Sequence, residues 1–415
     1  MMRSLHVHIG KQLAGQLAYT GGVLSFRYDT DYLVSKASLP LSRHLPLQTA
    51  PFEDRATRVF FANLLPEGAV RTQVARQVGV SSDNVFGLLE AIGGDCAGAL
   101  SLVSEDRALI RTDSYRPIAD DSLASELETL SAHPLLAGED KIRLSLAGAQ
   151  NKLPIYWDGK GYALPEGGSP STHILKTAIP QLKHSVLNEV FCMNLAARIG
   201  LNVPGAEVVT IGYQQVYRVE RYDRKLGPDG TIERLHQEDF CQALGIPPEL
   251  KYENEGGPGF KDCFQLVEEW SDEPLLDRQQ LLYWALFNFI IGNADAHGKN
   301  LSFLYADGVV RLAPFYDLIS TAVYERINNK FAMKMGGQKD PRYLQASNLK
   351  HFVEEIGIDI RTVRNAIKQM AANVERQSIR LAEEYHLLPE SASITDDILR
   401  IIQQRIVKAK MLTNV

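Results

Sequence analysis

The stretch Ile290–Phe303, IIGNADAHGKNLSF, places an aspartate, a histidine, a lysine and two asparagines directly after an apolar run. Asp295 and Asn300 are five positions apart, and Asp317 follows seventeen positions after Asn300. Phosphoryl transfer from a nucleotide uses such a set, because one aspartate accepts the proton of the attacking hydroxyl while an asparagine and a second acid hold Mg²⁺ on the phosphates. The spacing therefore predicts Asp295 as a catalytic base and Asn300 and Asp317 as metal ligands.

Two other interpretations of these residues stay open. Aspartate and asparagine at the end of a helix often serve only as caps or turn residues. A hydrolase could instead use Asp295, His297 and Asp317 as ligands of a transition metal, although no second histidine or cysteine stands at ligand spacing. The order D-x-H-x-x-N is closer to the catalytic loop of lipid kinases than to the H-R-D order of protein kinases.

A nucleotide site also needs groups that hold the phosphates, and the sequence offers candidates upstream. The segment Ser145–Lys152, SLAGAQNK, is expected as a loop between two strands, and its small residues would let backbone N–H groups approach phosphate oxygens. Lys176 lies on an expected strand, THILKTA, where a buried ammonium needs an anionic partner. Phosphates or Glu189, on the next expected helix, would supply that partner. A hairpin turn and solvent-facing charges are the ordinary alternatives for these residues.

The expected elements follow one another in the order of a kinase core. A strand, loop and strand precede the lysine strand and the helix that carries Glu189. Glu220–Tyr222 then falls where a hinge strand would present backbone groups to adenine, with Tyr222 against the ring. After Asp239 the pattern is mostly helical, except for a hairpin in NLSFLYADGVVRLAPFYD. We therefore predict an α+β, two-lobed, protein-kinase-like fold related to lipid-kinase cores, with a β-rich N-terminal lobe and a helical C-terminal lobe.

Composition changes along the chain predict three parts. Residues 1–110 form an α+β subdomain, residues 111–235 complete the N-terminal lobe with the loop, the lysine strand and the hinge, and residues 236–415 form the helical lobe. Within the first part, helical periodicity in DRATRVFFANLLPEGAVRTQVARQVG is broken at Pro66 and Gly68. The helix SVLNEVFCMNLAARIG is expected to end at Gly200.

The overall composition excludes some classes of protein. The net charge of −6 argues against a surface that binds nucleic acid everywhere, although a local basic strip remains compatible with it. No CxxC pair is present, so the cysteines are expected to be buried free thiols in a reducing compartment, namely Cys96, Cys192, Cys241 and Cys263. The N-terminus lacks the apolar segment of a signal peptide, and no run is long enough to span a membrane. We expect a cytoplasmic protein.

Nine stretches together resemble the HipA family of bacterial toxin kinases, and the resemblance covers nearly the whole chain. They are FFANLLPEG, SLAGAQNK, THILK, NEVFCMNLAARIGLNVP, VERYDR, HQEDFCQALG, KYENEGGPG, NADAHGKN and APFYD. The resemblance implies a serine/threonine-protein kinase that uses ATP and Mg²⁺. It implies that Asp295 is the catalytic base, that Asn300 and Asp317 bind the metal, and that Lys176 binds phosphate. Asn151 departs from the pattern, since some relatives carry an acid there.

The resemblance further implies a full set of nucleotide-binding residues and one modification site. The ATP site would comprise Ala147, Gly148, Ala149, Gln150, Asn151, Lys152, Lys176, Glu220, Arg221, Tyr222, His297, Gly298, Lys299, Asn300 and Asp317. Family members phosphorylate their own serine just before the loop, which maps to Ser145. A phosphate there would place about −1.5 to −2 charges where the phosphates of ATP must lie.

Partners are implied as well. A HipB-like dimeric helix-turn-helix antitoxin is expected to neutralise the toxin and bring it to operator DNA as a corepressor. The protein substrate is expected to be an aminoacyl-tRNA synthetase, such as glutamyl-tRNA synthetase, whose phosphorylation leads to growth arrest and persistence. No membrane partner is expected.

A competing hypothesis is a catalytically idle scaffold in such a repressor complex. In residues 359–385 the apolar positions Val363, Ile367, Met370 and Val374 share one helical face. The basic residues that lie largely elsewhere on this helix could contact DNA phosphates: Arg361, Arg364, Lys368 and Arg376. The ordinary alternative is a solvated helix face.

Overall fold

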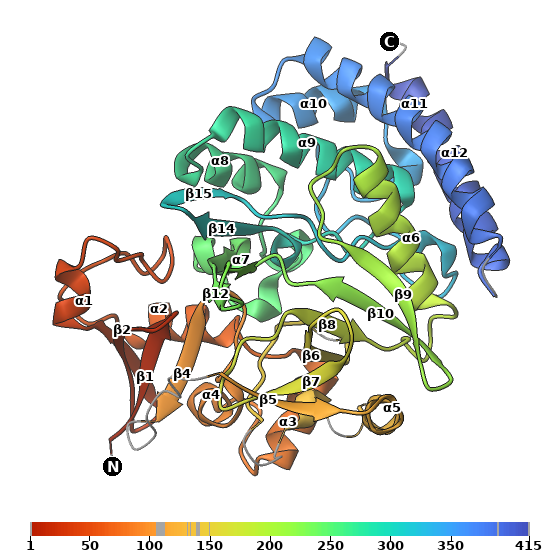
Figure 1. The fold of residues 1–415 in the computed structure, drawn as a ribbon. Coiled ribbons are helices and arrows are strands. Elements are labelled where there is room, and N and C mark those ends of the chain that lie inside the picture. Colours follow the sequence, from red (N-terminus) through yellow and green to blue (C-terminus); the bar gives the residue numbers. More distant parts are fainter. Residues whose placement is uncertain are drawn as a thin grey trace. The chain divides into compact units, whose positions relative to one another are not determined.

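The computed structural model describes residues 2–104, 113–130, 132, 134–137, 142–148, 150–387 and 390–413 (Figure 1). The chain divides into two compact units, each of which is discontinuous in sequence. Unit 1 comprises Met1–Thr177, Val209–Glu249 and Leu304–Val309, and unit 2 comprises Ala178–Val208, Leu250–Phe303 and Val310–Val415. Unit 1 contains most of the strands and unit 2 most of the long helices, which confirms the predicted α+β class.

The first sheet of unit 1 has the strand order β3-β2-β1-β4. Its strands are β1 (Arg3–Ile9), β2 (Gln12–Thr20), β3 (Val23–Tyr28) and β4 (Leu100–Ser104). Alternating apolar residues such as Leu5, Val7 and Phe26 are fully buried on one face. The helices α1 (Thr30–Val34), α2 (Asp54–Ala62), α3 (Gly68–Gln77) and α4 (Val85–Ile92) follow β3. The predicted interruption at Pro66 and Gly68 is confirmed, because α2 ends and α3 begins on either side of Pro66.

The second sheet has the strand order β5-β7-β6-β8-β10-β9. Its strands are β5 (Ser114–Ile118), β6 (Lys152–Trp157), β7 (Tyr162–Glu166), β8 (His173–Lys176), β9 (Ala206–Ile211) and β10 (Gln214–Glu220), and α5 (Asp120–Thr129) follows β5. The predicted strand before the loop is wrong, because residues 142–146 form no strand. Leu144 makes a single bridge to Asp95 instead, and Gly148 in the following loop makes a single bridge to Pro66.

The chain leaves this sheet through short elements before it becomes helical. These are β11 (Arg224–Leu226), β12 (Ile232–Arg234), β13 (His236–Asp239) and α7 (Phe240–Leu244). The predicted hairpin is confirmed as β14 (Ser302–Ala306) and β15 (Val309–Leu312), and a three-stranded sheet has the order β13-β14-β15.

The apolar helix that precedes the chemical motif, α9 (Pro274–Ile291), packs against three other helices of unit 2. The helices of this unit are α6 (Ser185–Arg198), α8 (Phe260–Trp270), α9, α10 (Ala346–Ile356), α11 (Ile360–Tyr385) and α12 (Ala392–Thr413). Figure 1 shows α11 and α12 side by side. The apolar face predicted for α11 is confirmed, since Val363 and Val374 are completely buried.

Gly292 ends α9 and turns the chain into the motif. Its φ is 72°, in the left-handed region that favours glycine, and its N–H bonds back to the helix. A Cβ atom at this position would lie 2.7 Å from side-chain atoms of Ala322 and Ile401. Both the backbone conformation and the close packing therefore require glycine where the motif begins.

The helix α6, which the sequence placed in the N-terminal lobe, belongs to unit 2 because it packs on α11 and α12. The four cysteines are buried and free, as predicted. In the part of the chain that the structure describes, no helix is long and apolar enough to cross a membrane.

Candidate active site

The loop after α9 is built around the side chain of Asn293, which sequence reasoning did not single out. The Asn293 amide donates to Asn288 Oδ1 at 2.8 Å and to the Asp317 carbonyl at 3.4 Å, and its Oδ1 accepts the Asp295 N–H at 3.0 Å. The N–H of Ala294 is held by Thr321 Oγ1 at 2.7 Å. One asparagine therefore ties α9, the motif and the segment after the β14–β15 hairpin together within unit 2.

Asp295, the acidic residue of the motif, faces solvent. Its side chain is 54% exposed, whereas the His297 side chain 4.0 Å away is buried. Its Oδ1 accepts a hydrogen bond from the Tyr252 hydroxyl at 2.6 Å. An exposed carboxylate on a backbone fixed by Asn293 is accessible to a substrate hydroxyl, as the role of a general base requires.

The structure brings Asn300 and Asp317 together. The Asn300 amide nitrogen lies 3.3 Å from Asp317 Oδ2, and Asn300 Oδ1 accepts the His297 N–H at 3.1 Å. Asp317 has a φ of 54°, a left-handed conformation that is uncommon outside glycine and that often marks functional sites. Asn300 and Asp317 both carry side-chain oxygens of the hard type that Mg²⁺ prefers, and Asn300 Oδ1 has a second lone pair besides the one that accepts the His297 N–H, so the residue types fit that ion.

The alternative transition-metal site needs several nitrogen, sulfur or carboxylate ligands in one place. Across the described ranges, no group of three or more histidine, cysteine, aspartate or glutamate side chains is arranged to hold a metal ion.

The middle of the motif is buried. His297, Lys299 and Asn300 are 5%, 7% and 5% exposed, and Gly298 begins the short 3-10 turn Gly298–Asn300 that joins them. Burial, with the positive charges of Lys251 and Lys299, holds the pKa of His297 well below its usual value, so the imidazole is neutral. A neutral histidine beside two lysines leaves the local charge to those lysines and to the two aspartates.

In unit 1, the second sheet carries two lysines on one face. Lys152 on β6 is directly opposite Lys176 on β8, and Lys176 is directly opposite Tyr217 on β10. Lys176 is only 5% exposed, and its Nζ lies 5.1 Å from the centroid of the Tyr217 ring. Opposed residues of antiparallel strands have Cβ atoms about 5 Å apart, and like charges there repel. The two lysines supply positive charge of the kind that binds a phosphate group.

The loop predicted to cover phosphates is fixed to the stretch FFANLLPEG. Ser145 Oγ donates to the Leu64 carbonyl at 2.9 Å, and the Glu67 N–H donates to the Gly148 carbonyl at 3.1 Å. Lys152 Nζ donates to the Ala147 carbonyl at 2.7 Å. Ser145 is completely buried.

Gln150 and Asn151 lie in the described part of the loop after Gly148. Gln150 Nε2 donates to the Thr177 carbonyl at 3.1 Å, and the side chain of Asn151 is half-buried. Ala149 lies outside the described residues.

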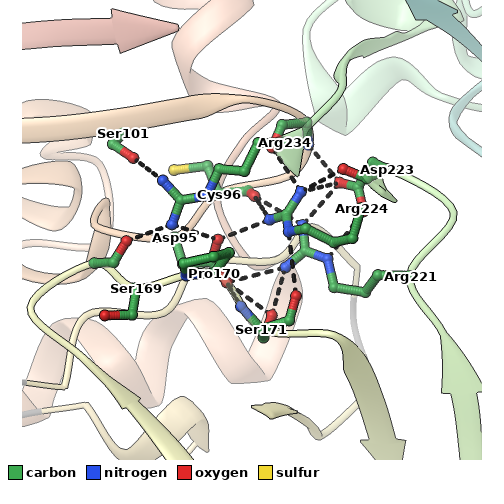
Figure 2. Close-up of polar contacts among 12 residues, drawn as sticks. Asp95, Cys96, Ser101, Ser169, Pro170, Ser171, Arg221, Asp223, Arg224 and Arg234 are labelled. Atoms are coloured by element: carbon green, nitrogen blue, oxygen red, sulfur yellow. Dashed lines mark hydrogen bonds and ion pairs between the residues drawn. The ribbon is translucent and has the colours of Figure 1, made fainter. Parts of the chain in front are cut away.

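A cluster of buried charged side chains surrounds Asp95 (Figure 2). Asp95 lies 2.7 Å from Arg224, 3.1 Å from Arg234 and 3.2 Å from Arg221 between carboxylate oxygen and guanidinium nitrogen. Asp223 lies 2.8 Å from Arg221. Burial alone would raise the pKa of Asp95, but the charges of Arg224, Arg221 and Arg234 outweigh it and hold the pKa below the usual range.

The backbone of Asp95 connects the cluster to the loop. Its N–H donates to the Arg143 carbonyl at 2.9 Å, and its own carbonyl accepts the Ser145 N–H at 3.0 Å. The Asp95 carboxylate also accepts a hydrogen bond from the Ser171 hydroxyl at 2.7 Å, and Ser171 lies two residues before β8. The cluster therefore fixes both the segment that carries Ser145 and the entry to the strand that carries Lys176.

Among the three hinge residues predicted to line the adenine, Arg221 has a different setting. Its guanidinium is 1% exposed and bonds to Asp95 and Asp223. Glu220 is exposed, and the half-buried Tyr222 donates its hydroxyl to Gln237. The Arg221 side chain thus acts within the charge cluster, and the contact of residues 220–222 with adenine, which would use backbone groups, stays a prediction.

Glu189, the predicted partner of Lys176, lies on α6 in unit 2 and is 5% exposed, whereas Lys176 lies in unit 1. Their ion pair stays a prediction. Sequence reasoning missed Asn293, Tyr252 and Asp95. Of these, Asn293 and Tyr252 lay inside stretches already quoted, NADAHGKN and KYENEGGPG, which was the available signal.

Two family models match the chain. The HipA N-terminal domain matches residues 5–103, and the HipA-like C-terminal domain matches residues 144–378. The candidate kinase Y4mE of Sinorhizobium fredii is 41% identical over 389 residues, covering 92% of this chain and 93% of Y4mE. The serine/threonine-protein kinase toxin HipA of Shewanella oneidensis is 33% identical over 400 residues, covering 93% of this chain and 90% of the toxin.

A solved structure is similar over the same extent. It is the Shewanella oneidensis MR-1 toxin–antitoxin complex of HipA, HipB and operator DNA, and the match has a TM-score of 0.87 at 30% identity over 99% of both chains. The predicted two-lobed, kinase-like fold is confirmed by this match. With both family models and relatives of this length and identity in agreement, the chain belongs to the HipA family.

Proposed function

We propose that this protein is a serine/threonine-protein kinase that transfers the γ-phosphate of ATP to a protein hydroxyl. The observation that carries the proposal is the arrangement in unit 2, where an exposed Asp295 stands on the same loop as Asn300 and Asn300 contacts Asp317. In this proposal Asp295 accepts the proton of the attacking hydroxyl. The Shewanella relative, named a serine/threonine-protein kinase toxin, supports the same chemistry.

Each remaining group has a role in this proposal. Mg²⁺, held by Asn300 and Asp317, would neutralise charge on the phosphates. In unit 1, Lys152 and Lys176 bind phosphate oxygens through the lysine-bearing face of the second sheet. The loop residues Ala147–Lys152 cover the phosphates, Glu220 and Tyr222 border the adenine, and His297–Lys299 border the nucleotide.

The proposed partners follow from the Shewanella relative, whose structure was solved as a complex. The Shewanella protein was solved with HipB and operator DNA, so we propose a HipB-like antitoxin dimer as partner and operator DNA as a contact of that complex. Arg361, Lys368 and Arg376 on α11 are exposed and would be available to DNA phosphates there. An aminoacyl-tRNA synthetase is the proposed substrate class, with growth arrest as the consequence of its phosphorylation.

The direct test is transfer of labelled γ-phosphate to protein, compared between the wild type and Asp317→Asn. Since Asp317 provides a metal ligand in the proposal, Asp317→Asn should raise the Mg²⁺ concentration for half-maximal transfer by at least roughly tenfold. Phosphoproteomics of cells that express the wild type, compared with an Asp295 variant, would identify the substrate. Absence of transfer by the wild type in the presence of ATP and Mg²⁺ would leave the idle scaffold as the better hypothesis.

We also propose that Ser145 is an autophosphorylation site, and this makes a separate prediction. Ser145→Asp should weaken ATP binding by roughly tenfold or more, because a charged group cannot remain in a site whose buried hydroxyl bonds to Leu64, and the loop must leave it. Titration of ATP by calorimetry measures the change. Ser145→Ala is the control, since it removes the hydroxyl without adding charge, and equal affinity of Ser145→Asp and wild type would contradict the prediction.

A further inference from the structure

The stretch KYENEGGPG has no role in the function proposed above, yet its first half is held rigidly in unit 2. We call residues 250–257 the Tyr252 segment. The Tyr252 carbonyl accepts the N–H groups of Glu255 and Gly257, both at 2.9 Å. The Glu253 N–H donates to the Ala332 carbonyl at 3.1 Å, and the Glu253 carboxylate lies 3.3 Å from Lys334 Nζ. The backbone on both sides of the Tyr252 side chain is therefore fixed.

The side chain of Tyr252 reaches the motif. Its hydroxyl donates to Asp295 Oδ1 at 2.6 Å, the usual distance for a hydroxyl that donates to a carboxylate. Its ring meets the His297 ring edge-on, with the centroids 5.2 Å apart and the planes at 85°. Lys251 Nζ lies 5.4 Å from the centroid of the Tyr252 ring. Both anchors of the tyrosine, the fixed backbone and the edge-on ring, hold its hydroxyl at the carboxylate.

An exposed aspartate has several side-chain rotamers, and only some of them present an oxygen to the hydroxyl of the protein substrate. The hydrogen bond from the Tyr252 hydroxyl to Oδ1 restricts the rotation of this carboxylate. We propose that Tyr252 is a positioning residue for phosphoryl transfer, which holds the Asp295 carboxylate in the orientation that accepts the proton of the substrate hydroxyl. This inference rests on the proposed kinase function and assigns a role to a residue outside the predicted site.

If the Tyr252 hydroxyl instead competed with the substrate hydroxyl for Asp295, removing it would raise kcat. A hydroxyl 2.6 Å from a general base also stands where a substrate hydroxyl must approach, so a competing tyrosine would slow the reaction. The rigid backbone of the Tyr252 segment favours positioning, because a group that must be displaced at every turnover would be expected on a freely moving loop. Removal of the hydroxyl distinguishes the two directly.

Tyr252→Phe should lower kcat by roughly tenfold, since a hydrogen bond to a charged group is lost while the ring remains. The KM for ATP should stay within about twofold, because Tyr252 acts through Asp295 and a general base affects the chemical step. Tyr343→Phe is the matched control, since Tyr343 is another tyrosine of unit 2 whose side chain is largely exposed. An unchanged or raised kcat in Tyr252→Phe would overturn the inference.

A second measurement does not need enzyme activity. With 3-fluorotyrosine at position 252, the ¹⁹F resonance should shift on Asp295→Asn, because the hydrogen-bond acceptor changes from a carboxylate to an amide. Asp359→Asn is the control, since Asp359 caps α11 and asparagine caps helices equally well. A resonance that ignores Asp295→Asn would refute the contact. This result stands whether or not the wild type transfers phosphate, so failure of the inference and failure of the proposed function are distinguishable.

Discussion

Asp95→Ala is expected to lower the free energy of unfolding by about 3–5 kcal/mol, because three arginines each lose a carboxylate contact inside a buried cluster. Asp95 is completely buried, and its carboxylate contacts Arg221, Arg224 and Arg234. Burial, together with the charge of Arg221, already lowers the pKa of Arg224 to about 10, which shows how much this guanidinium depends on its anionic neighbours. Denaturation in urea, followed by circular dichroism, measures the loss.

The matched control is Asp307→Asn in the same unit, because Asp307 has a φ of 52° and asparagine tolerates this conformation while removing the charge. Asp307 forms an ion pair with Lys225 at 3.0 Å, but the side chains are 79% and 50% exposed. An exposed pair of this kind contributes about 0–1 kcal/mol, since water and salt screen it. If both variants lost equally little stability, the charge cluster would not be the support of the loop that its geometry indicates.

Asp295→Gln is expected to reduce the rate of phosphoryl transfer by roughly 10²–10⁴-fold, the usual contribution of general acid–base catalysis. The amide cannot accept the proton of the attacking hydroxyl. Because Asp295 is exposed and lies on a loop fixed through Asn293, the substitution should leave the fold intact. Single-turnover transfer of labelled phosphate measures the loss of rate, and thermal unfolding checks the fold.

ATP affinity provides the internal control for this variant. The binding of Mg²⁺ and phosphates is assigned to other residues, so the Kd for ATP should change by no more than a few-fold while the rate falls. A variant that retained more than about a tenth of the wild-type rate would remove Asp295 from the role of base.

The sequence predicted those parts of the site whose signals are local. The step from α9 into the motif was visible because an apolar helix ends at Gly292, and the position of Asp317 followed from the hairpin between them. Residues of one short stretch, such as Asp295 and Asn300, must lie near one another whatever the fold. The family resemblance then extended these local patterns to the whole chain.

The parts that were missed depend on contacts between distant residues. Tyr252 and Asp295 are 43 positions apart, and Asp95 and Arg221 are 126 apart, so no periodicity connects them. The same reason explains the wrong strand at residues 142–146. Its alternating residues fit a strand, but its backbone groups bond singly to Asp95 and its neighbours instead of to a ladder. The burial of Arg221 likewise follows from two acids that the sequence does not place beside it.

The sealed position of Ser145 has a consequence for timing. A hydroxyl that is 0% exposed and bonded to Leu64 cannot meet any phosphate donor until residues 64–67 and 145–148 separate. When phosphoryl transfer to the opened loop is faster than reclosing, the rate of modification follows the frequency of this local opening. Amide hydrogen exchange at Glu67, whose N–H bonds to the Gly148 carbonyl, would report the opening. If Ser145 is the autophosphorylation site proposed above, the opening sets a delay between synthesis of the protein and its inactivation.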